Sequence, residues 1–226
     1  METNMNGDFN RPIFILGAPR SGLSLVAGSL NICGAWSEDT STATAANPEG
    51  VFNDRGLQNL IIKPILEKLN SDPLGVKDLP ILESLQEIPN LKDVIFNIIS
   101  NEGYIDDTPW IFKETRLTLI WPILMFAFPD ARWIIGRRET ADIVRSCLKT
   151  DATQQRLSDP AIWKTRTENY LKRLELLKIN MTSYNEIWPH RLTSDSLAPL
   201  ESLVTELGLT WKADDVSSYI DKKSQA

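Results

Sequence analysis

The segment 12–30, PIFILGAPRSGLSLVAGSL, constrains the fold more than any other part of the sequence. Its apolar run at 13–16 is too short for an amphipathic helix and suits a buried parallel strand. After a turn that contains two glycines, apolar residues recur at the i, i+3, i+4 and i+7 positions of a helix: Leu23, Val26, Ala27 and Leu30. A strand, a glycine-bearing turn and a helix in this order place backbone N–H groups around an anion, usually a phosphate. The sequence therefore predicts a phosphate-binding loop at 17–24.

This loop differs from the loop of ordinary ATPases and kinases. The Walker A loop reads G-x-x-x-x-G-K-[ST], and Leu23 stands where its lysine would reach the β- and γ-phosphates of a nucleoside triphosphate. Arg20 instead supplies a cation inside the loop, and Ser21 and Ser24 supply hydroxyl groups. The alternative is a Gly-Pro turn that joins a strand to a helix and leaves Arg20 in solvent.

The composition is ordinary for a globular protein and favours no particular class of binding partner. Of the 226 residues, 42% are hydrophobic, which is enough for a sizeable core, and the net charge of −6 gives no support to bulk nucleic-acid binding. Two cysteines, Cys33 and Cys147, form no disulfide framework or zinc pattern, and the single His190 excludes a histidine-rich metal site. Without a signal-peptide pattern or an apolar run of about 18 residues, we expect a cytoplasmic protein with no membrane span.

Further strand and helix patterns predict one α/β domain. Apolar strands are expected at 110–113, 131–136 and 190–194, and helices at 57–69, 91–99, 117–128, 160–188 and 197–207. We predict a three-layer, P-loop-like fold in which a short parallel sheet of four or five strands carries helices on both faces. Residues 1–11 are expected to form a flexible arm, and 12–226 a single domain with a helical acceptor-side insertion at about 56–105.

The loop resembles a known family. GAPRSGLSLVAG is similar to the 5′-phosphosulfate loop of the sulfotransferases, whose bacterial members commonly read G-x-P-R-S-G-T-S. Leu23 replaces the usual threonine, which removes a hydroxyl group and keeps the backbone N–H. The resemblance implies that one run of residues binds the cofactor: Ala18, Pro19, Arg20, Ser21, Gly22, Leu23 and Ser24.

The resemblance extends to a second phosphate motif. Arg138, Asp142 and Ser146 match the R-x-x-x-D-x-x-x-S signature with which the family binds a 3′-phosphate. A guanidinium group at a strand end and a hydroxyl on the next helix can both face one phosphate. Taken alone, the pattern also fits an amphipathic helix with incidental polar residues. The Lys-Gly-rich 3′-phosphate loop of the cytosolic animal enzymes is missing from the sequence, and Lys222-Lys223 is its nearest substitute.

A third segment, Lys113-Glu114-Thr115-Arg116-Leu117, resembles the K-D-P-R-L of bacterial sulfotransferases and the K-T-H-L-P of the cytosolic animal enzymes. The resemblance implies that Lys113 reaches the sulfonate group that is transferred. The histidine base of K-T-H falls on Thr115, which cannot accept a proton in the same way. Without the family, the same residues read as a solvated charge cluster at a strand end.

Two more segments are compared with the family. Residues 47–54, NPEGVFND, resemble the segment N-P-x-G-[FY]-[FW]-E-D, with Asn53 where glutamate is usual and Asp54 retained. The base candidates are therefore Glu49 and Asp54 first, followed by Glu114. The expected strand at 190–194 ends at Ser194 and Asp195, where relatives often carry Tyr-Glu-Asp.

The resemblance as a whole implies an enzyme that uses 3′-phosphoadenosine 5′-phosphosulfate (PAPS) and releases adenosine 3′,5′-bisphosphate (PAP). It would transfer the sulfonate group in line to a hydroxyl or amine of an unidentified small-molecule, glycan or lipid acceptor, without a metal ion. The catalytic residues implied are Arg20, Lys113, Glu49 and Asp54. Three alternatives stay open: a small-molecule P-loop kinase, a non-catalytic nucleotide-binding module and a purely structural α/β domain.

Overall fold

The computed structural model describes residues 8–38, 52, 54–72, 79–82, 85–105, 107–154 and 159–224. Four strands form one sheet with the order β2-β1-β3-β4, and all three pairings are parallel. The strands are β1 (Ile13–Gly17), β2 (Ile111–Lys113), β3 (Arg132–Gly136) and β4 (Asn185–Ile187). The predicted α/β class and the parallel sheet of four strands are confirmed.

Side chains of the central strand alternate between two apolar cores. Phe14 and Leu16 pack into one core, and Ile13 and Ile15 into the other. All five residues of β1 are buried. A parallel strand that is covered on both faces reads as a continuous apolar run, which is why this strand was evident from the sequence.

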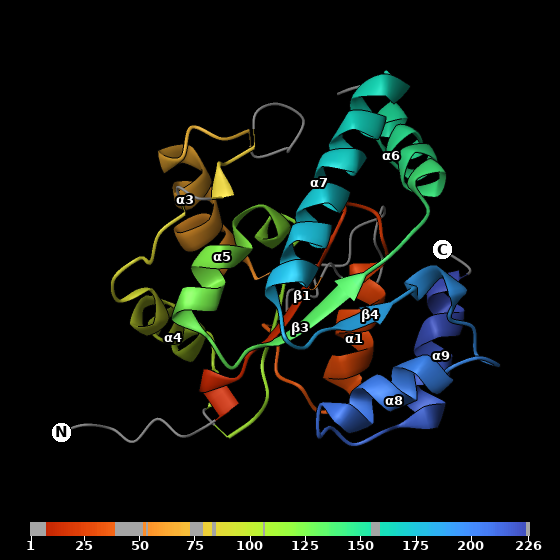
Figure 1. Ribbon diagram of the computed structural model, residues 1–226. Coiled ribbons are helices and arrows are strands. Elements are labelled where there is room, and N and C mark those ends of the chain that lie inside the picture. The colour runs from red at the N-terminus through yellow and green to blue at the C-terminus, as the bar shows by residue number, and fades with distance from the viewer. Residues whose placement is uncertain are drawn as a thin grey trace.

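Helices cover both faces of the sheet (Figure 1). The first core receives α2 (Arg55–Leu57), the π-helical η2 (Gln58–Ile62), α3 (Lys63–Lys68), α4 (Leu91–Asn101), α5 (Leu117–Ala127), α6 (Thr140–Gln154) and α7 (Pro160–Asn180). The second core receives α1 (Leu23–Ile32), α8 (Ala198–Glu206) and α9 (Ala213–Ser224). Within the described residues, no helix is long and apolar enough to cross a membrane.

The fourth strand lies elsewhere than predicted. Residues 190–194 do not form it, because the 3-10 helix η4 (Pro189–Arg191) occupies the start of that segment. Strand β4 instead lies at Asn185–Ile187 and pairs with 134–136 of β3. It is a three-residue edge strand in which only Ile187 is buried, so it carries little apolar signal of its own. Trp188, and not Ser194 or Asp195, therefore follows the strand.

Both ends of the chain, where the structure describes them, carry helices that were not predicted from the sequence. Residues 8–10 of the expected flexible arm form the 3-10 helix η1 (Asp8–Asn10), while 1–7 lie outside the described residues. The Phe9 ring is fully buried and stacks on Trp110, whose Nε1 donates a hydrogen bond to the Phe9 carbonyl oxygen over 3.0 Å. At the other end, α9 was not predicted, and its Val216 and Ile220 are fully buried in the second core.

Candidate functional site

The candidate site lies where β1 and β3 end. Gly17 and Gly136 are the last residues of these strands and face each other in the register. Since β2 lies on one side of β1 and β4 on the far side of β3, the strand order reverses here, which is where α/β sheets open a crevice for ligands. A Cβ atom on Gly17 would lie 2.6 Å from the Gly136 carbonyl oxygen, so the close approach of the two strand ends requires glycine.

The loop after β1 is held in a tight turn. Arg20 and Gly22 have positive φ angles of 64° and 87°, which is common for glycine and uncommon for arginine. The buried Ser21 hydroxyl donates a 2.6 Å hydrogen bond to the Ala18 carbonyl oxygen. This hydroxyl therefore stabilises the turn. The Arg20 side chain, in contrast, is exposed to solvent.

Leu23, the departure from the family loop, belongs to the core. Its side chain is buried in the second core, and its Cδ2 atom lies so close to Gly136 that a Cβ there would be 2.2 Å away. The apolar residue thus packs over the end of β3. Gly22 precedes it as the N-cap of α1, and Pro189 packs against Gly22 from the segment that follows β4.

The two phosphate motifs meet through hydrogen bonds. Arg20 Nε donates to Ser146 Oγ over 3.1 Å, and Arg138 Nη1 donates to the Arg20 carbonyl oxygen over 2.8 Å. Arg138 Nε is a buried atom for which no hydrogen-bond partner exists among the described residues. A buried donor of this kind calls for an acceptor. Asp142, the third residue of the signature, pairs with Arg145 on the surface of α6 over 2.7 Å.

Lys113 lies at the end of β2 with only 7% of its surface exposed. Its Nζ donates to Ser24 Oγ over 3.3 Å, which connects β2 to the phosphate loop. Burial lowers the pKa of Lys113 to about 8. The negative charge of Glu114 raises this pKa and offsets part of the effect of burial, whereas the positive charge of Lys223 lowers it further. An anion beside this ammonium group would relieve its unfavourable environment.

Glu114 is neutralised by Arg116. The Glu114 carboxylate is buried, and it accepts 3.0 Å hydrogen bonds from the Arg116 Nε, Nη2 and backbone N–H groups. Gln58 of η2 also donates to it. Burial favours the neutral acid, but the hydrogen bonds and the charge of Arg116 outweigh it and hold the pKa of Glu114 below its usual value. The cluster is therefore a buried ion pair and not a solvated one, and Glu114 is poorly placed to act as a base.

Asp54 lies in a group of three carboxylates. Its Oδ1 accepts a 2.6 Å hydrogen bond from the Leu57 backbone N–H at the start of α2. One oxygen each of Asp54, Glu38 and Glu102 lies within 4.8 Å of the others, a spacing that a divalent cation could bridge. Burial raises the pKa of Asp54 to about 6 and that of Glu102 to about 8, and the charge of Glu38 adds to both shifts. Glu49, the other first-ranked base candidate, lies outside the described residues.

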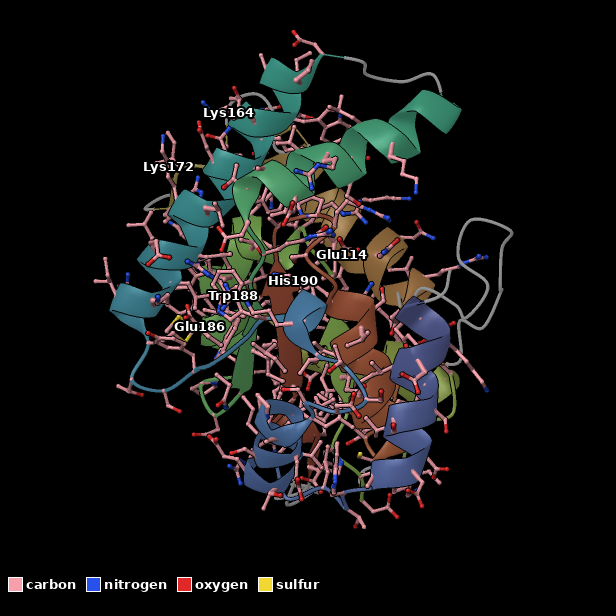
Figure 2. The ribbon with its side chains drawn as sticks, turned by 90° about the vertical axis from the view of Figure 1, so that its right-hand side faces the viewer. Glu114, Lys164, Lys172, Glu186, Trp188 and His190 are labelled. Carbon is pink, nitrogen blue, oxygen red and sulfur yellow. The ribbon has the colours of Figure 1, made fainter. Side chains whose placement is uncertain are left out.

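Residues 188–191 follow β4, and Pro189 packs against Gly22 of the loop. Figure 2 labels Trp188 and His190 of this segment. The Arg191 guanidinium lies 4.0 Å from the centre of the Trp188 ring and forms a 3.4 Å ion pair with Glu139. His190 is exposed.

Sequence reasoning missed several polar contacts to the loop. Thr118 of α5 donates to the Gly17 carbonyl oxygen over 3.3 Å and accepts from the Gly17 N–H over 3.2 Å. Tyr219 of α9 donates to the Ser24 carbonyl oxygen over 3.2 Å. Neither residue belongs to a motif. The apolar spacing of Val216 and Ile220 was the one signal that could have revealed the helix that carries Tyr219.

The comparisons with known proteins agree with this geometry. No protein-family model matches the sequence, and no curated protein matches it. Three similar solved structures are sulfotransferases. They are STF1 from Mycobacterium tuberculosis H37Rv (TM-score 0.51, 16% identity), STF9 from Mycobacterium avium (0.57, 13%) and the sulfotransferase domain of the olefin synthase from Synechococcus PCC 7002 (0.54, 16%).

In the same order, the matches cover 93%, 94% and 89% of this chain, and 70%, 67% and 75% of the other chains. At these identities the similarity establishes the fold. The motif resemblance had implied the same fold from the loop at 17–24 and the Arg138–Ser146 signature. The chain therefore has the fold of the bacterial sulfotransferases.

Proposed function

We propose that the protein is a PAPS-dependent sulfotransferase that transfers a sulfonate group to a hydroxyl or amine of a small-molecule, glycan or lipid acceptor. The observation that carries the proposal is the contact between the two anion-binding motifs, in which Arg20 bonds to Ser146 and Arg138 bonds to the Arg20 carbonyl. PAPS carries a phosphate on the 3′ side and a phosphosulfate on the 5′ side of one ribose. Two adjoining anion sites suit this ligand better than a ligand with a single phosphate.

The residues present fit such a nucleotide. The buried Arg138 Nε, without an acceptor among the described residues, would donate to the 3′-phosphate together with Ser146. The backbone of 18–24 and the Arg20 side chain would hold the 5′-phosphate at the N-terminus of α1. When bound, PAPS supplies a sulfonate group that is activated by its bond to this phosphate.

Lys113 would bind the oxygen atoms of the sulfonate. A buried ammonium stabilises developing negative charge more strongly than an exposed one, because water screens it less. Its neighbour Glu114 cancels only part of this charge, since that carboxylate is paired with Arg116. Arg20 and the loop N–H groups would stabilise the charge on the departing phosphate oxygen, so most of the catalysis would be electrostatic.

Asp54 is the base that we propose for the acceptor proton. Its pKa of about 6 lies near neutrality, where a carboxylate combines adequate basicity with a large ionised fraction. The raised pKa of Glu102 fits a protonated carboxyl group that donates a hydrogen bond to Asp54. Asp54 also lies one helical turn before Gln58, which donates to Glu114 beside Lys113. Glu49 is the alternative base.

Ligand-dependent thermal stability tests the proposal. PAP should raise the melting temperature, whereas 5′-AMP and ATP with magnesium should have little effect. A ligand at a hundredfold excess over its Kd adds about 2.7 kcal/mol to the free energy of unfolding. Stabilisation by ATP with magnesium alone would instead support a kinase, and no stabilisation by any of the three would support a purely structural domain.

Turnover separates an enzyme from a binding module. Protein that binds PAP is incubated with PAPS carrying labelled sulfur and with pools of hydroxyl and amine acceptors. Transfer of the label to an acceptor, in step with release of PAP, is the expected result. Tight PAP binding with no transfer to any acceptor would support the non-catalytic module.

A further inference from the structure

The last helix, α9, carries Tyr219, which bonds to Ser24 of the loop, and Lys223 beside the Tyr219 ring. We propose that Lys223 acts together with Lys113 on the sulfonate end of the donor, while Tyr219 positions Ser24 for the same contact. This inference rests on the proposed function, because it assigns a role within the proposed donor site.

The spacing of residues along α9 directs one face of the helix to α1 and the loop. Val216, Tyr219, Ile220 and Lys223 occupy positions i, i+3, i+4 and i+7, which form one stripe on a helix. Val216 and Ile220 are fully buried in the second core and anchor this stripe. Lys222 is adjacent in sequence, but it lies off the stripe and is exposed.

Tyr219 contacts the first turn of α1 directly. Its hydroxyl donates to the Ser24 carbonyl oxygen over 3.2 Å, and Ser24 Oγ accepts from Lys113 Nζ over 3.3 Å. The ring lies against Gly28, where a Cβ atom would be 2.1 Å from the Tyr219 hydroxyl oxygen. Glycine at position 28 thus permits the approach that places Tyr219 on Ser24. Tyr219 is a positioning residue, since it acts through Ser24.

Lys223 follows Tyr219 by one helical turn. Its Nζ lies 5.7 Å from the centre of the Tyr219 ring, and its charge is close enough to lower the pKa of Lys113. Two ammonium groups this near each other repel, and an anion between them removes the repulsion. The sequence comparison had linked Lys222-Lys223 to the 3′-phosphate. Lys223 instead lies beside Tyr219, whose hydroxyl bonds to Ser24, the residue that Lys113 also contacts.

Comparison of two nucleotides isolates the sulfonate contact. PAPS and PAP share the adenosine and both phosphate positions, but only PAPS carries the sulfonate group. Calorimetric Kd values are measured for both ligands with the unaltered protein and with Lys223→Met, which keeps an unbranched side chain of similar length and removes the charge. Lys223→Met should bind PAPS about tenfold more weakly, the size of one charge-assisted hydrogen bond, and should change PAP binding much less.

Two further variants serve as matched comparisons. Lys222→Met removes the same charge from the neighbouring exposed position and should leave both Kd values unchanged. Lys223→Arg retains the charge and should restore most of the PAPS affinity. A ratio of PAPS to PAP affinity that is the same in Lys223→Met as in the unaltered protein would overturn the assignment of Lys223, as would an equal effect of Lys222→Met.

The Tyr219 assignment has its own test. Tyr219→Phe keeps the ring against Gly28 and removes only the hydroxyl that donates to Ser24. It should lower PAPS affinity severalfold with an unchanged melting temperature and unchanged PAP affinity. An unaltered preference for PAPS would overturn the positioning role. If the unaltered protein binds neither nucleotide, the proposed function fails with the inference. If it binds both and the variants do not differ from it, only the inference fails.

Discussion

Arg20 Nε donates a hydrogen bond to Ser146 Oγ over 3.1 Å, although 126 residues separate the two in the sequence. This bond joins the loop after β1 to the helix after β3. It also orients a guanidinium group whose backbone has a positive φ angle, so the arginine is held in place before any ligand arrives. Preorganised charge of this kind avoids reorganisation at the moment of reaction.

Removing the Arg20 guanidinium should abolish most of the activity. Arg20→Ala is expected to lose about 2–4 kcal/mol of transition-state stabilisation, measured as the decrease in kcat/KM for PAPS. Arg20→Gly is the matched control for the backbone, because glycine adopts the positive φ angle without strain. Both variants should lose activity equally. Near-normal transfer by either one would contradict the role of Arg20 at the 5′-phosphate.

Arg138 should recognise the 3′-phosphate selectively. Arg138→Ala is expected to weaken PAP binding about tenfold to a hundredfold, the value of a charge-assisted contact, and to affect adenosine 5′-phosphosulfate little because that ligand lacks the 3′-phosphate. Arg137→Ala is the control, since Arg137 pairs with Glu175 over 2.9 Å. Equal losses for the two ligands in calorimetric titration would be incompatible with this role.

Lys113 should make PAPS use depend on pH. Its pKa is lowered to about 8, so the free enzyme loses the ammonium charge as the pH rises through that value, and kcat/KM for PAPS should decrease on the alkaline side. Lys113→Arg keeps its charge throughout this range and should remove the alkaline decrease. A pH profile that is the same in both proteins would show that another group titrates.

Lys113 should also make the free energy of unfolding depend on pH. Its contribution to stability should increase with pH, whereas kcat/KM should decrease. Its folded-state pKa of about 8 lies below the ordinary lysine value of 10.5, so the unfolded chain binds more protons between these two values. The contribution of Lys113 to the free energy of unfolding should therefore rise as the pH increases from about 8 to 10.5. Urea unfolding across this window, compared with Lys113→Met, measures the contribution. A difference between the two proteins that does not vary with pH would contradict it.

Asp54→Asn should separate the base from the helix cap. Asparagine is as good an N-cap as aspartate, so the bond to the Leu57 N–H and the melting temperature should be retained. The value of kcat should fall about 10²- to 10⁴-fold, and the dependence on a group with a pKa of about 6 should disappear. Normal kcat in this variant would transfer the role to Glu49.

Gly28→Ala should loosen α9. A Cβ atom there would lie 2.1 Å from the Tyr219 hydroxyl oxygen and 2.9 Å from a Phe52 ring carbon. We expect a loss of about 1–3 kcal/mol in the free energy of unfolding, against a gain of up to about 1 kcal/mol for alanine over glycine within a helix. In a protein that already carries Tyr219→Ala, Gly28→Ala should cost less in the free energy of unfolding, because the side chain with which the new Cβ atom clashes is absent. The effects of the two changes in urea unfolding should therefore be non-additive. Full additivity would mean that Tyr219 does not pack on Gly28.

Local patterns determined the main elements and the two phosphate motifs. The run at 13–16 is apolar on both faces, and the helix after it repeats at 3.6 residues, so both follow from short-range sequence. The family resemblance of the motifs likewise made Arg20, Lys113, Arg138 and Ser146 candidates for the site. Strand β4 and helix α9 were missed or misplaced, since β4 has a single buried residue and its position depends on pairing with β3.

Only the tertiary structure decided how the candidate site is completed and charged. Tyr219 reaches Ser24 across 195 residues, and Thr118 reaches Gly17 across 101, contacts that no local pattern encodes. Whether a charged group is buried is also a property of the packed chain. Without the family resemblance, the sequence read Lys113 and Glu114 as one solvated charge cluster at a strand end. Packing buried both, paired Glu114 with Arg116 and left the charge of Lys223 acting on Lys113. Desolvation and charge partners act through space, which is why the sequence named these residues but not their protonation behaviour.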